Sequence, residues 1–150
     1  MAYVRHTGRY QGLAEVFADL FTRLMQWAQP RGLVRPDSQI LAVYHDNPSI
    51  TEDDRLRISA CISVPPGTET SGDVGQMVVE GGRFAVGRFT LGDLDYGEAW
   101  YSLAGGWLPS SGYEPDDRHP YERYPFDEGG SDPDKRRVDV CLPVRPLRRY

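Results

Sequence analysis

The feature that most constrains the fold is an internal repeat, because the chain matches itself when the sequence is shifted by 80 residues. The identical pairs keep one register without a gap: Trp27 with Trp107, Gly32 with Gly112, Asp37 with Asp117, Tyr44 with Tyr124, Cys61 with Cys141 and Pro66 with Pro146. A long period that occurs only twice predicts a duplicated half-domain rather than a solenoid. We therefore expect one domain over residues 1–150, built from halves at about 1–67 and 74–147.

The first half carries the signals of a strand, a helix and two further strands. Apolar residues at helical spacing form one stripe from Leu13 to Trp27, and Pro30 and Gly32 end that helix. Strands are predicted over residues 3–7, 40–44 and 57–64.

The second half repeats this plan. Its strands are predicted over residues 83–90, 120–125 and 137–144. The helical stripe consists of Tyr96, Trp100, Leu103 and Trp107, and ends before Pro109 and Gly112. The segment 126–134, which is rich in glycine and acidic residues, is the segment that we expect to be most mobile.

A strand-helix-strand-strand unit used twice predicts an α+β fold. The two halves would be related by a pseudo-twofold axis, with one antiparallel sheet and both helices on one face of it. Side chains of the central strands would then line a central cleft that holds a ligand.

The charge balance of the chain excludes several classes of protein. The chain has 17 Lys and Arg residues against 22 Asp and Glu residues, which gives a formal net charge of −5. Such a chain repels the phosphate backbone, so direct nucleic-acid binding is not expected. No apolar run approaches the roughly 20 residues of a transmembrane helix. The first residues also lack the pattern of a secretory signal, so we expect a cytoplasmic protein that does not bind membranes.

The cysteines and histidines predict neither a disulfide framework nor a metal centre. Cys61 and Cys141 each lie in an apolar strand pattern, where a buried thiol acts as a small hydrophobic group. His6, His45 and His119 are scattered singly. The chain also lacks a glycine motif of the kind that cradles phosphate groups. We therefore expect no metal and no cofactor.

The segment 121–124 carries the sharpest functional signal. Glu122 and Tyr124 would point to the same face of a strand, because side chains alternate along it. A carboxylate beside aromatic rings in a partly desolvated cleft suits a cationic or polarised aromatic ligand. An alternative interpretation is an exposed strand carboxylate paired with Arg123 or Arg137, and the pattern does not choose between them.

Further residues extend this hypothesis. Tyr44 lies on the equivalent strand of the first half, and Trp100, near the middle of the second helix, is a candidate pocket wall. A carboxyl group buried against aromatic rings can also serve as a general acid or base. Glu122 is therefore a candidate catalytic residue as well as a candidate ligand-binding residue.

Several segments, taken together and in order, resemble a known family. They are residues 4–10 (VRHTGRY), 42–48 (AVYHDNP), 56–65, 81–86 (GGRFAV), 121–124 (YERY) and 138–146. In this combination the chain resembles the GyrI-like small-molecule-binding proteins, which are also the effector-binding domain of AraC-type and MerR-type regulators. The resemblance covers nearly all 150 residues.

The resemblance has implications for the fold and for the site. It implies the same duplicated arrangement that the repeat predicts. It implies that Glu122 matches the acidic residue characteristic of the family's ligand cleft, and that Tyr124, Tyr44 and Tyr10 are aromatic lining of that cleft.

The resemblance also ranks three functions. The chain starts directly at the effector-binding pattern, so it looks like a standalone member that binds a small, drug-like or toxin-like molecule and serves toxin resistance. Other standalone members inhibit DNA gyrase, which makes protein–protein contact with gyrase the second function. The third is hydrolysis, with Glu122, of strained cyclopropane rings in toxins that alkylate DNA.

Overall fold

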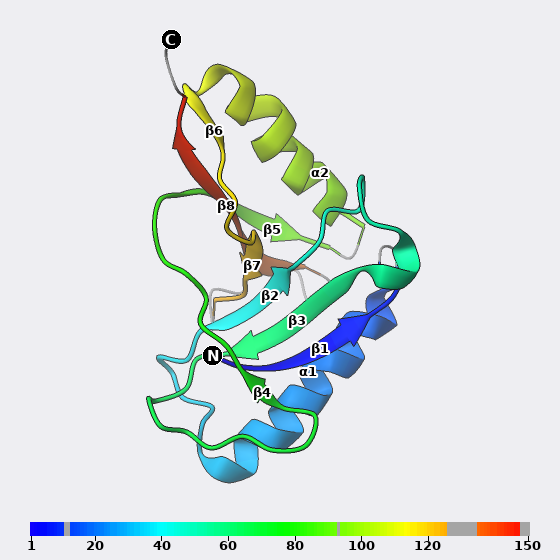
Figure 1. Ribbon diagram of the computed structural model, residues 1–150, viewed down its shortest axis with the longest axis vertical. Coiled ribbons are helices and arrows are strands. Elements are labelled where there is room, and N and C mark those ends of the chain that lie inside the picture. Colours follow the sequence, from blue (N-terminus) through cyan, green and yellow to red (C-terminus); the bar gives the residue numbers. More distant parts are fainter. Residues whose placement is uncertain (11–12, 93, 126–134, 148–150) are drawn as a thin grey trace. The chain divides into compact units, whose positions relative to one another are not determined.

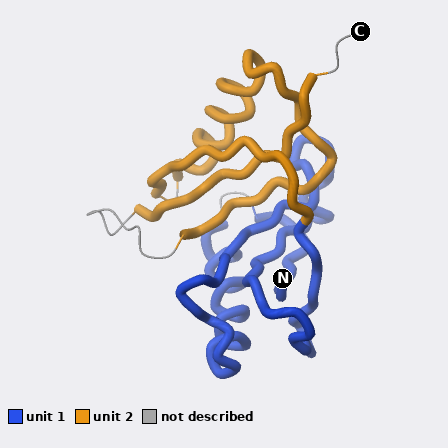
Figure 2. Tube along the Cα trace, turned by 90° about the vertical axis from the view of Figure 1, so that its left-hand side faces the viewer, with its two compact units in different colours: residues 1–79 blue, residues 80–150 orange. Residues whose placement is uncertain are grey.

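The structure is a computed structural model that describes residues 1–10, 13–92, 94–125 and 135–147 (Figure 1). The chain divides into two compact units, Met1–Val79 and Glu80–Tyr150, which Figure 2 draws in different colours. Each unit contains a strand, a helix and two further antiparallel strands in that order, together with one additional short strand, so the predicted α+β fold with duplicated halves is confirmed. That both units belong to one domain, with a twofold relation and a shared cleft, stays a prediction.

The first unit holds one α-helix and four strands. They are β1 (Ala2–Thr7), α1 (Ala14–Ala28), β2 (Ile40–Tyr44), β3 (Arg57–Ile62) and β4 (Gly75–Gln76), with single 3-10 turns at Gln29–Arg31 and Asp53–Arg55. Its strands pair in the order β4-β1-β3-β2, and all of these pairings are antiparallel.

Helix α1 packs against β1 and β3 (Figure 1). The predicted apolar stripe supplies its inner face, since Leu20, Leu24 and Trp27 are buried. The helix ends where predicted: Pro30 lies in the 3-10 turn Gln29–Arg31, and Gly32 follows with φ +67°, a left-handed conformation that favours glycine.

In the second unit, β8 (Arg136–Pro146) is the strand on which the others assemble. The remaining elements are β5 (Phe84–Leu91), α2 (Tyr96–Tyr101), η3 (Ser102–Trp107, π-helical), η4 (Leu108–Ser110, 3-10), β6 (Tyr113–Pro115) and β7 (Tyr121–Arg123). Strand β8 pairs antiparallel with β5 along one edge, and with β7 and β6 in succession along the other. The short strand β6 is not predicted by the sequence pattern.

The core of the second unit lies between this sheet and α2. Val138, Val140 and Val144 of β8 pack with Ala99 and Leu103, which come from α2 and η3. Tyr96, Trp100 and Tyr124 flank this cluster as half-buried rings. The helix and the 121–124 segment therefore share one apolar layer.

The prediction that Trp107 belongs to the buried stripe is wrong. The Leu108 N–H donates to the Leu103 carbonyl, five residues earlier, which makes one π-helical turn. Leu103 and Leu108 are consequently the buried positions, at 8% and 9% exposure, whereas Trp107 is 43% exposed. Trp107 stacks instead on Tyr113, with ring centroids 6.1 Å apart. Trp27, its counterpart in the repeat, is buried, so the two halves use the same residue differently.

Other predicted features are confirmed or lie outside the described residues. Cys61 and Cys141 are free thiols and both are buried, as predicted. Strand β3 ends at Ile62, two residues before the predicted end. The segment 126–134, which was predicted to be mobile, lies outside the described residues.

Candidate ligand-binding site

The candidate site begins with the position of Glu122 on β7. In the antiparallel register with β8, Glu122 lies opposite Val140, which belongs to the apolar layer under α2. Because strand side chains alternate, Glu122 shares this face while Tyr121 and Arg123 point to the other. Glu122 is 0% exposed. The interpretation of Glu122 as an exposed strand carboxylate is therefore wrong.

Both oxygens of the Glu122 carboxylate accept a hydrogen bond from an aromatic residue. The indole Nε1–H of Trp100 donates to Oε2 at 2.7 Å, and the hydroxyl of Tyr124 donates to Oε1 at 2.6 Å. Burying a carboxylate is costly unless its oxygens are hydrogen-bonded. Trp100 on α2 and Tyr124 after β7 supply those bonds, so the helix and the strand are linked through the carboxylate.

The Tyr124 hydroxyl is held in its neutral form. Burial raises the pKa of this phenol well above its ordinary value, and the adjacent Glu122 charge raises it further. Tyr124 therefore acts as a hydrogen-bond donor at neutral pH rather than as a base.

A second aromatic group forms in the first unit. Tyr10 is 3% exposed, and Tyr44 is half-buried. The centroid of the Tyr10 ring lies 5.7 Å from that of Tyr44 and 5.9 Å from that of Phe17, which it meets edge to face. Such geometries are favourable for aromatic pairs. The structure thus brings together two of the predicted lining residues, Tyr10 and Tyr44, with Phe17 as a neighbour that sequence reasoning missed.

The chain as a whole matches one family description. The model of the GyrI-like small molecule binding domain matches residues 1–145. The chain belongs to the GyrI-like family. The resemblance seen in the sequence motifs is thereby confirmed.

Two similar proteins carry the name of gyrase inhibitors. This GyrI-like chain is 33% identical over 143 residues to the DNA gyrase inhibitor of Edwardsiella ictaluri (strain 93-146), covering 91% of this chain and 88% of that protein. It is 42% identical over 71 residues to DNA gyrase inhibitor 2 of Dickeya dadantii (strain 3937), covering 45% of this chain. That second match spans only 44% of the Dickeya protein.

Solved structures share the GyrI-like fold at low sequence identity. EcmrR, in a DNA complex determined by cryo-EM, matches 97% of this chain with a TM-score of 0.65 and 15% identity, over 53% of its own length. An uncharacterised conserved protein from Listeria innocua matches 97% of this chain with a TM-score of 0.59 and 13% identity, over 88% of its length. These likenesses concern the fold alone.

The predicted site residues of this GyrI-like chain fall into two groups. Glu122, Tyr124 and Trp100 are joined by hydrogen bonds in the second unit, and Tyr10 and Tyr44 are in ring contact in the first. The prediction that both groups line one cleft stays a prediction.

The arginines that could have paired with Glu122 have another partner, Asp139. Arg123 donates to Asp139 Oδ2 from Nε at 3.1 Å and from Nη2 at 2.9 Å. Arg137 Nε lies at ion-pair distance, 3.5 Å, from Asp139 Oδ1. Asp139 is buried and was missed by sequence reasoning. The signal that could have found it is the two-residue spacing of Arg137 and Asp139, which places both side chains on the same face of a strand.

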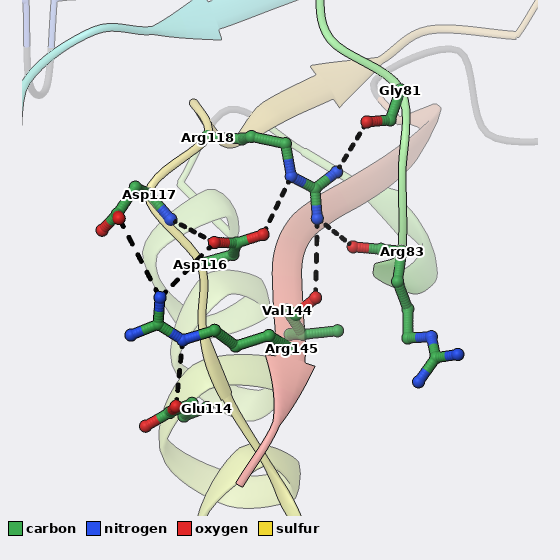
Figure 3. A network of polar contacts seen from close by, with 8 residues as sticks. All are labelled: Gly81, Arg83, Glu114, Asp116, Asp117, Arg118, Val144 and Arg145. Atoms are coloured by element: carbon green, nitrogen blue, oxygen red, sulfur yellow. Dashed lines mark hydrogen bonds and ion pairs between the residues drawn. The ribbon is translucent and has the colours of Figure 1, made fainter. Parts of the chain in front are cut away.

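A polar network holds the segment that leads into β7 (Figure 3). The Arg118 guanidinium donates to Asp116 Oδ2 at 3.1 Å and to the carbonyls of Gly81, Arg83 and Val144, at 3.1, 2.7 and 3.5 Å. This one side chain therefore fastens the loop before β7 to β8 and to the segment that enters β5. Sequence reasoning did not identify it.

A second arginine continues the network on the β8 side (Figure 3). Arg145 Nε donates to Glu114 Oε1 at 2.9 Å, and its Nη1 lies 3.7 Å from Asp116 Oδ1 and 3.9 Å from Asp117 Oδ2. These ion pairs are partly exposed and are worth little individually. Their role is to hold the 114–118 segment against β8.

The described residues do not group into a metal centre, since no three His, Cys, Asp or Glu side chains among them are arranged to hold an ion. Burial raises the pKa of Cys61 to about 12 and that of Cys141 to about 11. Both thiols are thus poor nucleophiles at neutral pH. No helix in the described part of the chain is long and apolar enough to cross a membrane.

Proposed function

We propose that this GyrI-like chain binds a hydrophobic or cationic aromatic small molecule at Glu122, in a role in toxin resistance. The observation that carries the proposal is the fully buried Glu122 carboxylate, which accepts hydrogen bonds from the side chains of two aromatic residues, Trp100 and Tyr124. A negative charge in apolar surroundings attracts a cation strongly, because the local dielectric is low.

The aromatic neighbours of Glu122 supply a second source of attraction for the ligand. Trp100 and Tyr124 present ring surface beside the carboxylate, and a planar cation gains stacking and cation–π attraction from such rings. Their fixed hydrogen bonds to Glu122 hold the rings in place before the ligand arrives.

Ligand-dependent thermal stability tests this proposal. Planar aromatic cations and hydrophobic toxins are screened against the wild type, Glu122→Gln and the control Glu98→Gln, which removes the same charge from an exposed position on α2. A ligand at roughly 100 times its Kd adds about 2.7 kcal/mol of stability. Shifts in the wild type and the control that shrink in Glu122→Gln support the proposal, and shifts that are equal in all three contradict it.

A second candidate function, contact with DNA gyrase, is favoured by a separate observation. The Edwardsiella relative named DNA gyrase inhibitor aligns over 91% of this chain. The test is supercoiling by purified gyrase with excess folded protein. Inhibition that persists in Glu122→Gln would support a protein–protein function that is separate from the ligand site, and no inhibition at any concentration would remove this candidate.

A further inference from the structure

On the sheet of the first unit, two strands place a cation, a hydroxyl and an aromatic ring together. In the β1–β3 register, Arg5 lies opposite Ser59 and Tyr3 lies opposite Cys61. Arg5 Nε donates to Ser59 Oγ at 3.1 Å, and its guanidinium lies over the Tyr3 ring, 4.6 Å from the centroid. The ring fixes the plane of the guanidinium.

His45 joins the same group from the end of β2. Its Nε2 lies 2.8 Å from Ser59 Oγ. Ser59 is 0% exposed, whereas Arg5 and His45 are half-buried. One buried hydroxyl therefore holds a guanidinium and an imidazole side by side.

Arg5 differs from the other half-buried arginines of the described residues. Each of the others has a carboxylate within ion-pair distance: Arg23 with Asp19, Arg118 with Asp116, Arg123 and Arg137 with Asp139, and Arg145 with Glu114. Arg5 has none among the described residues, although acidic residues outnumber basic ones in the chain.

The donor count of Arg5 shows that its guanidinium has more donors than acceptors among the described residues. A guanidinium carries five N–H donors and no acceptor. One donor goes to the Ser59 hydroxyl, and one is directed at the Met77 sulfur at 3.9 Å, a weak acceptor. The remaining three donors have no acceptor among the described residues. A planar fork of N–H groups matches an oxyanion with two oxygens.

We propose that Arg5, with Ser59 and His45 beside it, forms a binding site for a small oxyanion, a phosphate or carboxylate group. The guanidinium donates to two oxygens of the anion, while Tyr3 and Ser59 keep the fork in place. This site lies in the first unit and does not rest on the function proposed for Glu122.

The test measures melting temperature against inorganic phosphate and, separately, acetate, with chloride balancing the ionic strength. The wild type is compared with Arg5→Gln, Arg5→Lys and the control Arg88→Gln, which removes the same charge from an exposed position on β5. A saturable shift with phosphate or acetate is expected in the wild type and in Arg88→Gln. The anion that shifts the melting temperature at the lower concentration identifies whether the group is a phosphate or a carboxylate.

Affinity in Arg5→Gln should fall at least tenfold. If that variant does not fold, Arg5→Lys keeps the charge but not the fork and should bind several times more weakly. Equal responses in the wild type and in the folded Arg5 variant overturn the proposal, as does a shift that never saturates.

Discussion

The Trp100 indole nitrogen on α2 lies 2.7 Å from the Glu122 carboxylate on β7, so a helix and a strand of the second unit meet at a buried charge. The apolar layer around this contact explains why the two residues depend on each other. The indole needs an acceptor when it is buried, and the carboxylate needs a donor.

Replacing Trp100 with phenylalanine keeps an aromatic ring and removes the donor. The Oε2 atom of Glu122 then loses the hydrogen bond from the Trp100 indole within an apolar layer, so Trp100→Phe should lower the free energy of unfolding by about 1–3 kcal/mol. Urea denaturation measures the change. Trp107→Phe is the matched control, because Trp107 is 43% exposed and its indole donates no hydrogen bond to a described residue. A loss of stability in Trp107→Phe as large as in Trp100→Phe would refute the explanation.

Tyr124 predicts how stability depends on pH in the alkaline range. Its pKa is raised in the folded state, mainly by burial, so above the ordinary tyrosine pKa the unfolded chain loses this proton first. The stability contribution is complete below that pH and is lost as the pH rises toward the folded-state value. Denaturation midpoints should fall more steeply with rising pH in the wild type than in Tyr124→Phe.

The control for Tyr124 is Tyr101→Phe, at a ring that is 72% exposed. This variant should keep the alkaline slope of the wild type. Identical slopes in the wild type and Tyr124→Phe would show that Tyr124 does not titrate in the way described.

The π-helical turn predicts an unusual deletion. Removing Gly106 would place Leu103 and Leu108 four residues apart, the spacing of a regular α-helix, and both would stay buried. The deletion should therefore cost less than about 1 kcal/mol, within the range of mild surface changes. Deleting Gly97 from the regular part of the helix should cost several times more, because it rotates Tyr96 away from Trp100. Urea denaturation measures the free energy of unfolding of both variants. Equal costs would argue against the explanation that the π-helical turn holds one extra residue between Leu103 and Leu108.

Gly82 is constrained by its backbone and by Arg118. Its φ is +142°, and a Cβ at this position would collide with Arg118 Nη1. Gly82→Ala should lower the free energy of unfolding by about 1–3 kcal/mol, the cost of a strained backbone. Gly81→Ala is the control, since a Cβ there meets open space and its φ is not in the left-handed region. Equal stability of the two variants would contradict the constraint described for Gly82.

The sequence predicts much of the fold because the repeat and the apolar periodicity are local signals. Strand β2 begins and ends at the predicted residues, and Gly32 and Gly112 both adopt positive φ at equivalent places. Trp107 escapes prediction because one extra residue in a helical turn leaves no mark in an apolar pattern. The three-residue strand β6 escapes because its pairing with β8 depends on tertiary contact.

The candidate site is predicted in part for similar reasons. Strand alternation places Glu122 and Tyr124 on one face, and the helical stripe places Trp100 near them. Alternation cannot show which face is buried, so the pairing of Arg123 with Asp139 is visible only once the register with β8 is known.

The central claim is tested most directly by the Kd of one planar aromatic cation, proflavine, measured by fluorescence anisotropy. The account predicts binding to the wild type and to Glu98→Gln with equal Kd, and binding to Glu122→Gln that is at least tenfold weaker, about 1.4 kcal/mol. Binding of equal strength in all three proteins would contradict the claim that the Glu122 carboxylate recognises the ligand.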